Sequence, residues 1–520
     1  MKKIITLLFL AGAVSLPAGD LETIGVTVLR QVDPTLTGSG VKVAQPEGSS
    51  PGGSDYQVNP GYVGQPVSWF TYISTNGTIA TGFPNSAGVE SGHADAVGMH
   101  FYGTPGGTAT NVSHVDNYDA DYFYSHYISH LLPLVNPARV VNQSFAFNTN
   151  SESIVDPAYD DYAASNNVIF LSGVGNGGAY PVLPPGTAYN SLGVALYFSP
   201  PLVAGPLADG RCKPDIVAPD EADLGAEADS YAIPYVAGAA AILVQAADRG
   251  DGGANTNAAA DLRTVKALLL NGAIKPAGWT NGTASPLDAR YGAGMVNVFN
   301  SWEQLKGGRH AWIESASFSS GGAHPPGGNT NNEPTLVGWD YNSISTTSGQ
   351  DTVNHYYFKL AAGDPFTLTA TLVWNKQYHT NDINQLNLFL YNAANSNLVT
   401  CSTSRVDNVE HIYKPTLPAG RYDLQVLKKG SPTQISQSET YALAFEIFTM
   451  PLSVRLTNGG AVISWPVAPT GFQLESATGL TSPVTWASVT NAVAITNNQD
   501  VVTLPVGNGN RFFRLHRPAF

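Results

Sequence analysis

The stretch from Ala228 to Ala240 constrains the fold of this chain more than any other. It reads Ala-Asp-Ser-Tyr-Ala-Ile-Pro-Tyr-Val-Ala-Gly-Ala-Ala, a composition typical of a buried helix. Ser230 stands at its start and Pro234 is expected in its first turn, where a missing N–H costs little. Such a helix directs unpaired N–H groups and its positive dipole end at whatever reacts with the serine. A lone serine here is ordinarily a helix cap, so a reactive role requires partners elsewhere in the chain.

Apolar stretches typical of buried strands alternate with helical patterns on both sides of this helix. Strands are predicted over 40–47, 139–145, 168–171 and 214–219, and helices over 90–99, over 121–132, from Asp156-Pro157 and from Asp261. The order β-α-β-α predicts a parallel sheet, in which ligands gather at the carboxyl ends of the strands.

Three polar residues are predicted at that edge of the sheet. Glu47 ends the first strand, and Asn176 lies in the glycine-rich turn that follows the strand over 168–171. His93 lies in the first turn of a helix, where the dipole disfavours the cationic imidazole. Each alone has an ordinary interpretation as a loop acid, a turn former or a helix-start residue. Together with Ser230 they supply a carboxylate, a base, an amide and a hydroxyl.

This constellation resembles the subtilisin-like serine peptidases over about residues 25–305. The resemblance implies an α/β fold, with a subtilisin-like parallel sheet flanked by helices. It also implies that Ser230 is the nucleophile, His93 the general base and Glu47 the carboxylate that orients the imidazole. Asn176 and the Ser230 N–H would donate to the oxyanion. The blocks that carry the resemblance, in the family's order, are 40–44, 93–98, 141–144, 175–177, 213–219, 230–240 and 291–297.

The same resemblance implies where substrate binds. Ser144, Phe145 and Ala146 match the edge segment that pairs with an extended peptide. Val174 and Gly175 match the opposite wall, so these two segments are expected to form the substrate-binding groove.

After about residue 310 the helical period gives way to short alternating strands divided by Gly, Pro and Asn turns. Two all-β sandwich-type domains are therefore expected, the first similar to a jelly roll and the second to a fibronectin type III module. The expected organisation is a signal peptide at 1–18, a subtilisin-like peptidase domain at 19–309, a β sandwich at 310–449 and a small β module at 450–520. The chemistry requires no cofactor. Asn381-Asp382 or the loop over 248–253 could bind structural calcium, with an ordinary turn as the alternative.

Composition bounds the partners and the location. A net charge of −14 without a basic stripe argues against a nucleic-acid partner. Protein or peptide substrates are what the resemblance to the serine peptidases implies. Lys2-Lys3, the apolar run 4–13 and the small residues after it predict a signal peptide and hence a secreted or extracytoplasmic protein. No later segment reaches the roughly 20 apolar residues of a transmembrane helix. Cys212 and Cys401 form no disulfide framework, and the oligomeric state stays open.

Three stretches depart from the family pattern. Glu47 replaces an Asp, Ala94-Asp95-Ala96 replaces Gly-Thr-His, and Ala228-Asp229 replaces Gly-Thr. An acid beside Ser230 could stabilise protonated His93 and oppose oxyanion charge, depending on where it points. The first hypothesis is a secreted serine endopeptidase that forms an acyl-enzyme. The alternatives are a catalytically impaired subtilisin-fold binding or surface protein, and an adhesive protein in which the β modules act.

Overall fold

The structure is a computed structural model that describes most of the chain. The described residues are 19–147, 152–176, 181–197, 205–219, 229–310, 314–326, 335–363, 365–430, 434–457, 460–467, 469–481, 484–497, 499–507 and 509–516. The expected signal peptide and Ala228 lie outside them.

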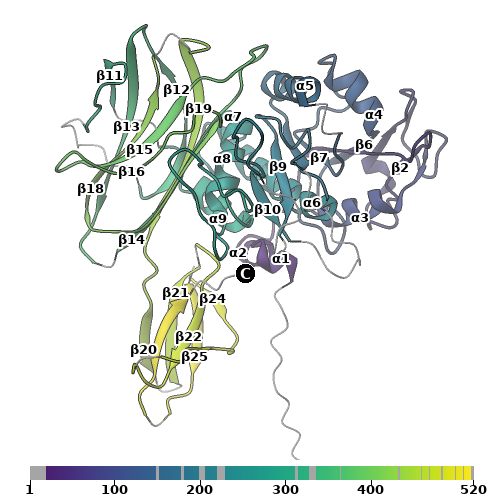
Figure 1. Cartoon of the computed structure of the whole chain (residues 1–520). Coiled ribbons are helices and arrows are strands. Elements are labelled where there is room, and N and C mark those ends of the chain that lie inside the picture. Colours follow the sequence, from purple (N-terminus) through teal and green to yellow (C-terminus); the bar gives the residue numbers. More distant parts are fainter. Residues whose placement is uncertain are drawn as a thin grey trace, which may run out of the picture.

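An eight-stranded sheet forms the centre of the first part of the chain (Figure 1). Its order is β10-β9-β8-β7-β1-β6-β3-β4, and all pairs are parallel except β3 with β4. Nearly all residues of the central strands are buried, polar ones included, because both faces of the sheet are covered. Their bounds are β1 Lys42–Glu47, β3 Phe70–Ile73, β4 Ile79–Ala80, β6 His114–Asp119, β7 Val140–Gln143, β8 Ile169–Gly173, β9 Leu192–Leu196 and β10 Ile216–Ala218. The predicted parallel α/β sheet is confirmed.

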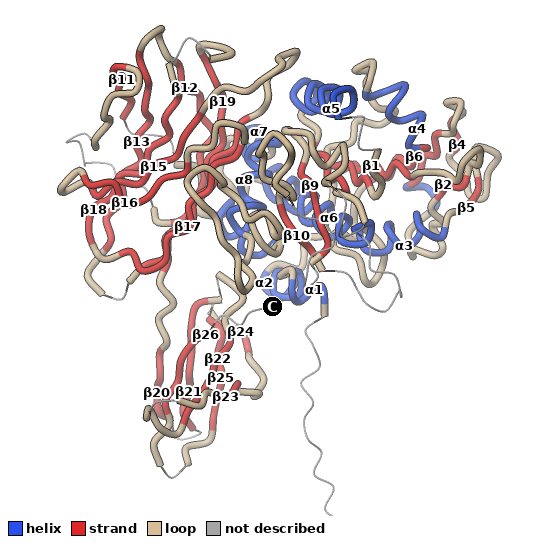
Figure 2. Tube along the Cα trace, viewed as in Figure 1, coloured by secondary structure: helices blue, strands red, loops and turns tan. Residues whose placement is uncertain are grey.

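All helices of the described residues belong to this first part (Figure 2). The longer ones are α3 Gly92–Phe101, α5 Glu152–Asn166, α6 Asp229–Asp248, α8 Leu262–Gly272 and α9 Val298–Lys306. The shorter ones are α1 Asp20–Thr23, α2 Val26–Val32, η1 Val67–Trp69, α4 Ala120–Tyr122, η2 Phe123–Ile128 and α7 Thr256–Ala259, and a small parallel pair joins β2 Asp55–Gln57 to β5 Val89–Glu90.

Helix α6 is the buried core helix that its composition predicts. Small residues are needed along it, because a Cβ at Gly238 would lie 2.3 Å from the Cβ of Thr108. By length and composition α6 could also cross a membrane, but 83% of its most apolar window is buried within the protein. That burial is typical of the core helix of a globular domain.

Three predicted helix boundaries are wrong. α5 already includes Glu152, so Pro157 lies inside the helix and does not open it. The helix predicted over 121–132 ends at Ile128 as the π-helical η2, and Leu131 beyond it has φ of 55°, which excludes helical backbone there. Since α6 includes Asp229, Pro234 falls in its second turn, where its missing N–H frees the carbonyl of Ser230.

A β sandwich follows (Figure 1). One sheet has the order β11-β13-β18-β15-β16 and the other β12-β19-β14-β17, with antiparallel pairing throughout. The core between them includes Trp374, Phe358 and Phe445. The bounds are β11 Glu314–Ser319, β12 Val337–Ser345, β13 Gln350–Leu360, β14 Phe366–Trp374, β15 Leu386–Asn392, β16 Asn397–Ser402, β17 Val409–Leu417, β18 Gly420–Lys428 and β19 Ser438–Phe448.

The sandwich shares a hydrophobic core with the α/β part. Trp339 on β12 and Ala442 and Ala444 on β19 pack into the same buried cluster as the helices of the first part. Helix α8 contacts α6 and α9 of the first part as well as strands β14 and β19 of the sandwich. The two parts are therefore packed together through apolar side chains.

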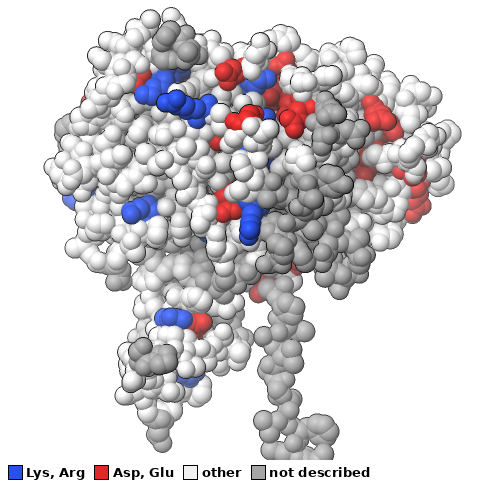
Figure 3. All heavy atoms as spheres, viewed as in Figure 1, with Lys and Arg blue, Asp and Glu red and all other residues white. Residues whose placement is uncertain are grey.

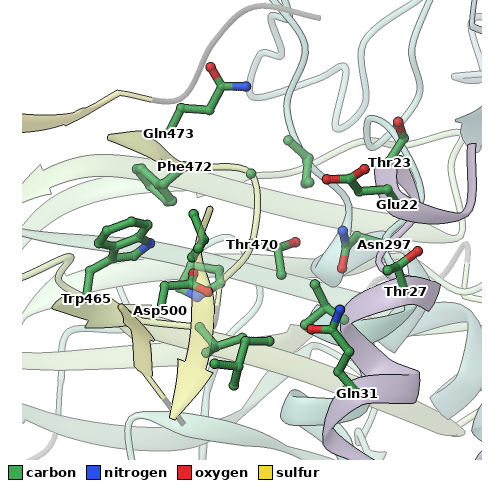
Figure 4. Close-up of a pocket in the computed structure, with 17 residues that line it drawn as sticks. Glu22, Thr23, Thr27, Gln31, Asn297, Trp465, Thr470, Phe472, Gln473 and Asp500 are labelled. Carbon is green, nitrogen blue, oxygen red and sulfur yellow. The ribbon is translucent and has the colours of Figure 1, made fainter. Parts of the chain in front are cut away.

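The last unit is a small pair of antiparallel sheets, in the orders β20-β21-β25-β24 and β23-β22-β26. A cavity of about 310 Å³ lies between this unit and α1–α2, with Trp465 and Phe472 on one side and Glu22 and Gln31 on the other (Figure 4). The bounds are β20 Ser453–Thr457, β21 Gly460–Pro466, β22 Gln473–Ala477, β23 Ala487–Ser488, β24 Ala494–Thr496, β25 Gln499–Leu504 and β26 Phe512–His516. Charged side chains are sparse on the face drawn in Figure 3, as the low charged fraction of 12% requires.

Candidate active site

Glu47 and His93 form a hydrogen-bonded pair at the carboxyl end of the sheet. Glu47 is the last residue of β1, and His93 lies in the first turn of α3, which Ser91 caps by accepting the N–H of Ala94. The Nδ1 of His93 is 2.9 Å from Oε2 of Glu47. The glutamate side chain is 1% exposed and that of the histidine 39%. The carboxylate is thus enclosed while the imidazole reaches solvent.

Opposing effects act on the protonation of His93. Burial lowers the pKa of the imidazole, because the cation is desolvated. The charge of Glu47 and its hydrogen bond raise the pKa by more, so the pKa of His93 ends above its ordinary value. Glu47 therefore both fixes the ring and stabilises the imidazolium, which is what a general base requires of its partner.

Ser230 lies in the first turn of α6 and is bonded to Ser144 in both directions. The Ser230 hydroxyl donates to the carbonyl of Ser144 at 3.3 Å, and the Ser144 hydroxyl donates to the carbonyl of Ser230 at 2.8 Å. That carbonyl needs an outside donor because Pro234, four residues on, has no N–H. The two bonds between Ser144 and Ser230 therefore hold the start of α6 against the end of β7.

His93 approaches the same helix end. Its ring centroid lies 5.9 Å from that of Tyr231, the residue after Ser230. The Ser230 hydroxyl is directed at Ser144, and no hydrogen bond joins His93 to Ser230 among the described residues. Bonds between a nucleophile and its base are often long without substrate and shorten when substrate binds.

Asn176 lies at the N-terminus of α6. Its Oδ1 accepts the N–H of Asp229 at 2.8 Å, so its Nδ2 is the end of the amide left to donate. The Oδ1 of Asp229 in turn accepts the N–H of Leu196 on β9 at 2.8 Å. The Asp229 side chain is therefore buried and directed at the sheet. The carboxylate that binds His93 is that of Glu47.

The two predicted walls of the substrate groove differ in character. Ser144, Phe145 and Ala146 continue from the end of β7, with Ala146 exposed and Phe145 half-buried. Val174 is fully buried in a cluster with Val182 and Ala195, so only its backbone can meet a substrate. Gly175 has φ of +104° and lies against Leu183, where a Cβ would come within 2.9 Å.

Sequence reasoning missed Gln45, which bonds directly to Glu47. Its Nε2 is 2.8 Å from Oε1 of Glu47, so the carboxylate is held at both oxygens. The available signal was the spacing: residues two apart on a strand share one face of the sheet, and a buried polar residue on that face needs a partner.

The two candidate calcium segments bind protein groups. In the loop over 248–253, Arg249 pairs with Asp251 at 2.5 Å and with Asp33 at 2.6 Å. Asp382 accepts the N–H of Ile383 at 2.8 Å. No cluster of three or more His, Cys, Asp or Glu side chains suited to a metal occurs within the described ranges.

One segment of the chain matches a known protein family. Residues 74–294 match the model of the subtilase family, and this segment includes His93, Asn176 and Ser230. No curated protein matches the chain.

Several solved structures are similar to parts of the chain. The prenylagaramide maturation protease PagA is 22% identical, with 54% of this chain and 98% of that chain covered and a TM-score of 0.39. Tripeptidyl peptidase 2 is 13% identical, with coverage of 78% and 44% and a TM-score of 0.34. The Aeromonas sobria serine protease, in complex with the chaperone ORF2, is 12% identical, with coverage of 92% and 88% and a TM-score of 0.36.

Proposed function

We propose, from the match of residues 74–294 to the model of the subtilase family, that the chain is a secreted serine endopeptidase. The observation that carries the proposal is the 2.9 Å bond between Glu47 and His93 beside the N-terminus of the helix that bears Ser230. Glu47 lies outside the matched segment, so its role rests on this geometry alone.

The proposed reaction forms an acyl-enzyme. His93 takes the proton of the Ser230 hydroxyl as its Oγ attacks the substrate carbonyl, and then gives that proton to the leaving amine. Glu47 stabilises the intervening imidazolium. The Nδ2 of Asn176 and the N–H of Ser230 donate to the oxyanion, where the loss of one donor costs on the order of 3 kcal/mol. Water then releases the acyl group by the same route.

Two further features support activity over an impaired site. The Asp229 carboxylate is turned into the sheet, where the N–H of Leu196 binds it. Its backbone N–H meanwhile orients the Asn176 amide as the oxyanion requires. The Asp229 side chain therefore has a structural role in holding β9 against the helix start, and Asn176 is held by the backbone of residue 229.

The substrate and the location are proposed from the segments beside the site. An extended peptide would add as a strand along 144–146, which suits cleavage within a chain. Secretion rests on the N-terminal sequence, and no cofactor is needed for the acyl-enzyme route.

The test is labelling of the purified full chain with a fluorophosphonate probe, which reacts where a base and an oxyanion hole activate a serine. Labelling lost in Ser230→Ala and His93→Ala, together with casein cleavage lost in Ser230→Ala, would support the proposal. No labelling of a folded sample between about pH 5 and 10 would instead favour the impaired binding protein.

A further inference from the structure

A chain of buried hydrogen bonds begins at Oε1 of Glu47, the carboxylate oxygen that His93 does not bind. The Nε2 of Gln45 donates to Oε1 of Glu47 at 2.8 Å and to the carbonyl of Ala94 at 2.9 Å. The Oε1 of Gln45 accepts the hydroxyl of Tyr102 at 2.5 Å. Gln45 and Tyr102 are both fully buried. The chain therefore links strand β1 to helix α3 from the inside.

The chemistry of the partners fixes the direction of every bond in this chain. Nε2 faces a carboxylate and a carbonyl, which only accept, so both amide hydrogens are used. Oε1 must then be the acceptor, and Tyr102 must be the donor. A flipped amide would place oxygen against oxygen at a buried site, which is costly. Tyr102 thus holds the Gln45 amide in the one orientation that serves Glu47.

The packing leaves room for this arrangement. A Cβ at Gly98 on α3 would come within 3.0 Å of the Tyr102 hydroxyl, so the hydroxyl reaches Gln45 because position 98 has no side chain. The ring of Phe70 packs edge-on against that of Tyr102, with centroids 5.9 Å apart. The Tyr102 side chain is thereby held in place from two sides.

We propose that Gln45, oriented by Tyr102, is a positioning residue that fixes the Glu47 carboxylate against His93. A glutamate has one more rotatable bond than the aspartate of the family pattern, so it loses more conformational entropy when its side chain is held in one position. Gln45 restricts the Glu47 side chain at Oε1 while His93 binds Oε2, and its bond to Ala94 sets the distance between β1 and the start of α3. The consequence for catalysis rests on the proposed function; the consequence for His93 does not.

The experiment compares Gln45→Leu and Tyr102→Phe with the full-length wild type. The first readout is the pKa of His93, measured by NMR on histidine-labelled protein with His93→Ala to assign the signal. The second is the rate of fluorophosphonate labelling as a function of pH. Tyr162→Phe is the matched control, because its buried hydroxyl donates to the carbonyl of Leu132 and has no link to Glu47.

In Gln45→Leu, Glu47 is free to turn away from His93, so burial dominates and the pKa of His93 falls. The pH midpoint of labelling should move down with it, and the labelling rate at the optimum should fall about 10-fold to 100-fold, the usual cost of a displaced group. Tyr102→Phe removes only the hydroxyl, so it tests the same hydrogen bonds if Gln45→Leu does not fold. It should lower the pKa of His93 and the pH midpoint of labelling by less than Gln45→Leu does. Tyr162→Phe should shift neither.

A His93 pKa unchanged in both variants would overturn the proposal, as would an equal change in Tyr162→Phe. If wild-type protein does not label at all, the proposed function fails, and the NMR titration still decides the role of Gln45. If wild-type protein labels and both variants label alike at every pH, the proposed function stands and the role of Gln45 is refuted.

Discussion

The Ser144 hydroxyl donates to the carbonyl of Ser230 at 2.8 Å and replaces the helical bond that Pro234 cannot make. Because Ser144 lies at the end of β7, the bond joins the expected substrate strand to the residue expected to attack. The position of Ser230 therefore depends on a side chain 86 residues earlier in the chain.

This relationship predicts a coupling between Ser144 and Pro234. Ser144→Ala leaves the Ser230 carbonyl without its donor and should lower the free energy of unfolding by about 1–2 kcal/mol. Pro234→Ala supplies a backbone N–H to that carbonyl, so Ser144→Ala should cost less in the Pro234→Ala background. Urea unfolding of the four proteins in the cycle measures the difference. Strictly additive effects would show that the carbonyl does not depend on the Ser144 hydroxyl.

Glu47→Gln should reduce turnover of an unfolded protein substrate by roughly 10⁴-fold, the effect of the corresponding Asp→Asn exchange in a serine protease triad. The amide can no longer hold the imidazole in the tautomer that accepts the serine proton. Glu47→Asp keeps the charge but withdraws it by one methylene, so the loss should be smaller. Turnover of each variant is measured, and its circular dichroism spectrum shows whether the fold is intact. Wild-type turnover in Glu47→Gln would reject the role of this carboxylate.

The pH dependence follows from the raised pKa of His93. The free enzyme needs a neutral imidazole, so kcat/KM should rise with pH through that pKa, with a midpoint above the ordinary value of about 6.5. In Glu47→Gln the residual activity should rise with pH around a lower midpoint than in the wild type. Burial lowers the pKa of His93, and the variant lacks the Glu47 charge that opposes this effect. A pH profile of each protein checks the order of the two midpoints; the reverse order would contradict this account of His93.

How much of the site was predictable depends on the range of the contacts. The composition around Ser230 indicated a buried helix, and the ends of strand patterns indicated Glu47 and Asn176. The bond from Tyr102 to Gln45 joins residues 57 positions apart through the packing of α3 on β1, which no local pattern encodes. The direction of the Asp229 side chain likewise depends on β9, and the burial of Val174 depends on residues from several distant segments.

Asp95, in the position of a family threonine, should make stability depend on pH. Burial raises its pKa to about 7, and the nearby acids Glu90 and Glu47 act in the same direction, against a hydrogen bond from the N–H of Asn59. The folded state therefore takes up a proton that the unfolded state lacks between about pH 4 and 7, and stability falls as pH rises through that range.

The matched variant is Asp95→Asn, which keeps the acceptor for Asn59 and removes the charge. It should raise the melting temperature relative to wild type more at pH 8 than at pH 4.5. Thermal unfolding of both proteins at the two pH values gives this difference directly. An equal difference at both values would mean that Asp95 has the same protonation in the folded and unfolded states.

The β sandwich should be inseparable from the α/β part of the chain in folding. Asn271 near the end of α8 accepts the hydroxyls of Thr369 and Thr371 on β14, at 2.9 and 3.0 Å, and all three residues are buried. Asn271→Ala leaves these hydroxyls without that acceptor, so it should lower the free energy of unfolding by about 1–3 kcal/mol. The exposed Asn397→Ala is the control and should change it by less than about 0.5 kcal/mol. A second measurement follows the unfolding of the wild-type protein. Because α8 contacts both units, the near-UV circular dichroism signal and fluorophosphonate labelling should be lost in one shared transition. A variant in which the sandwich unfolds first while labelling persists would show that the two units fold separately.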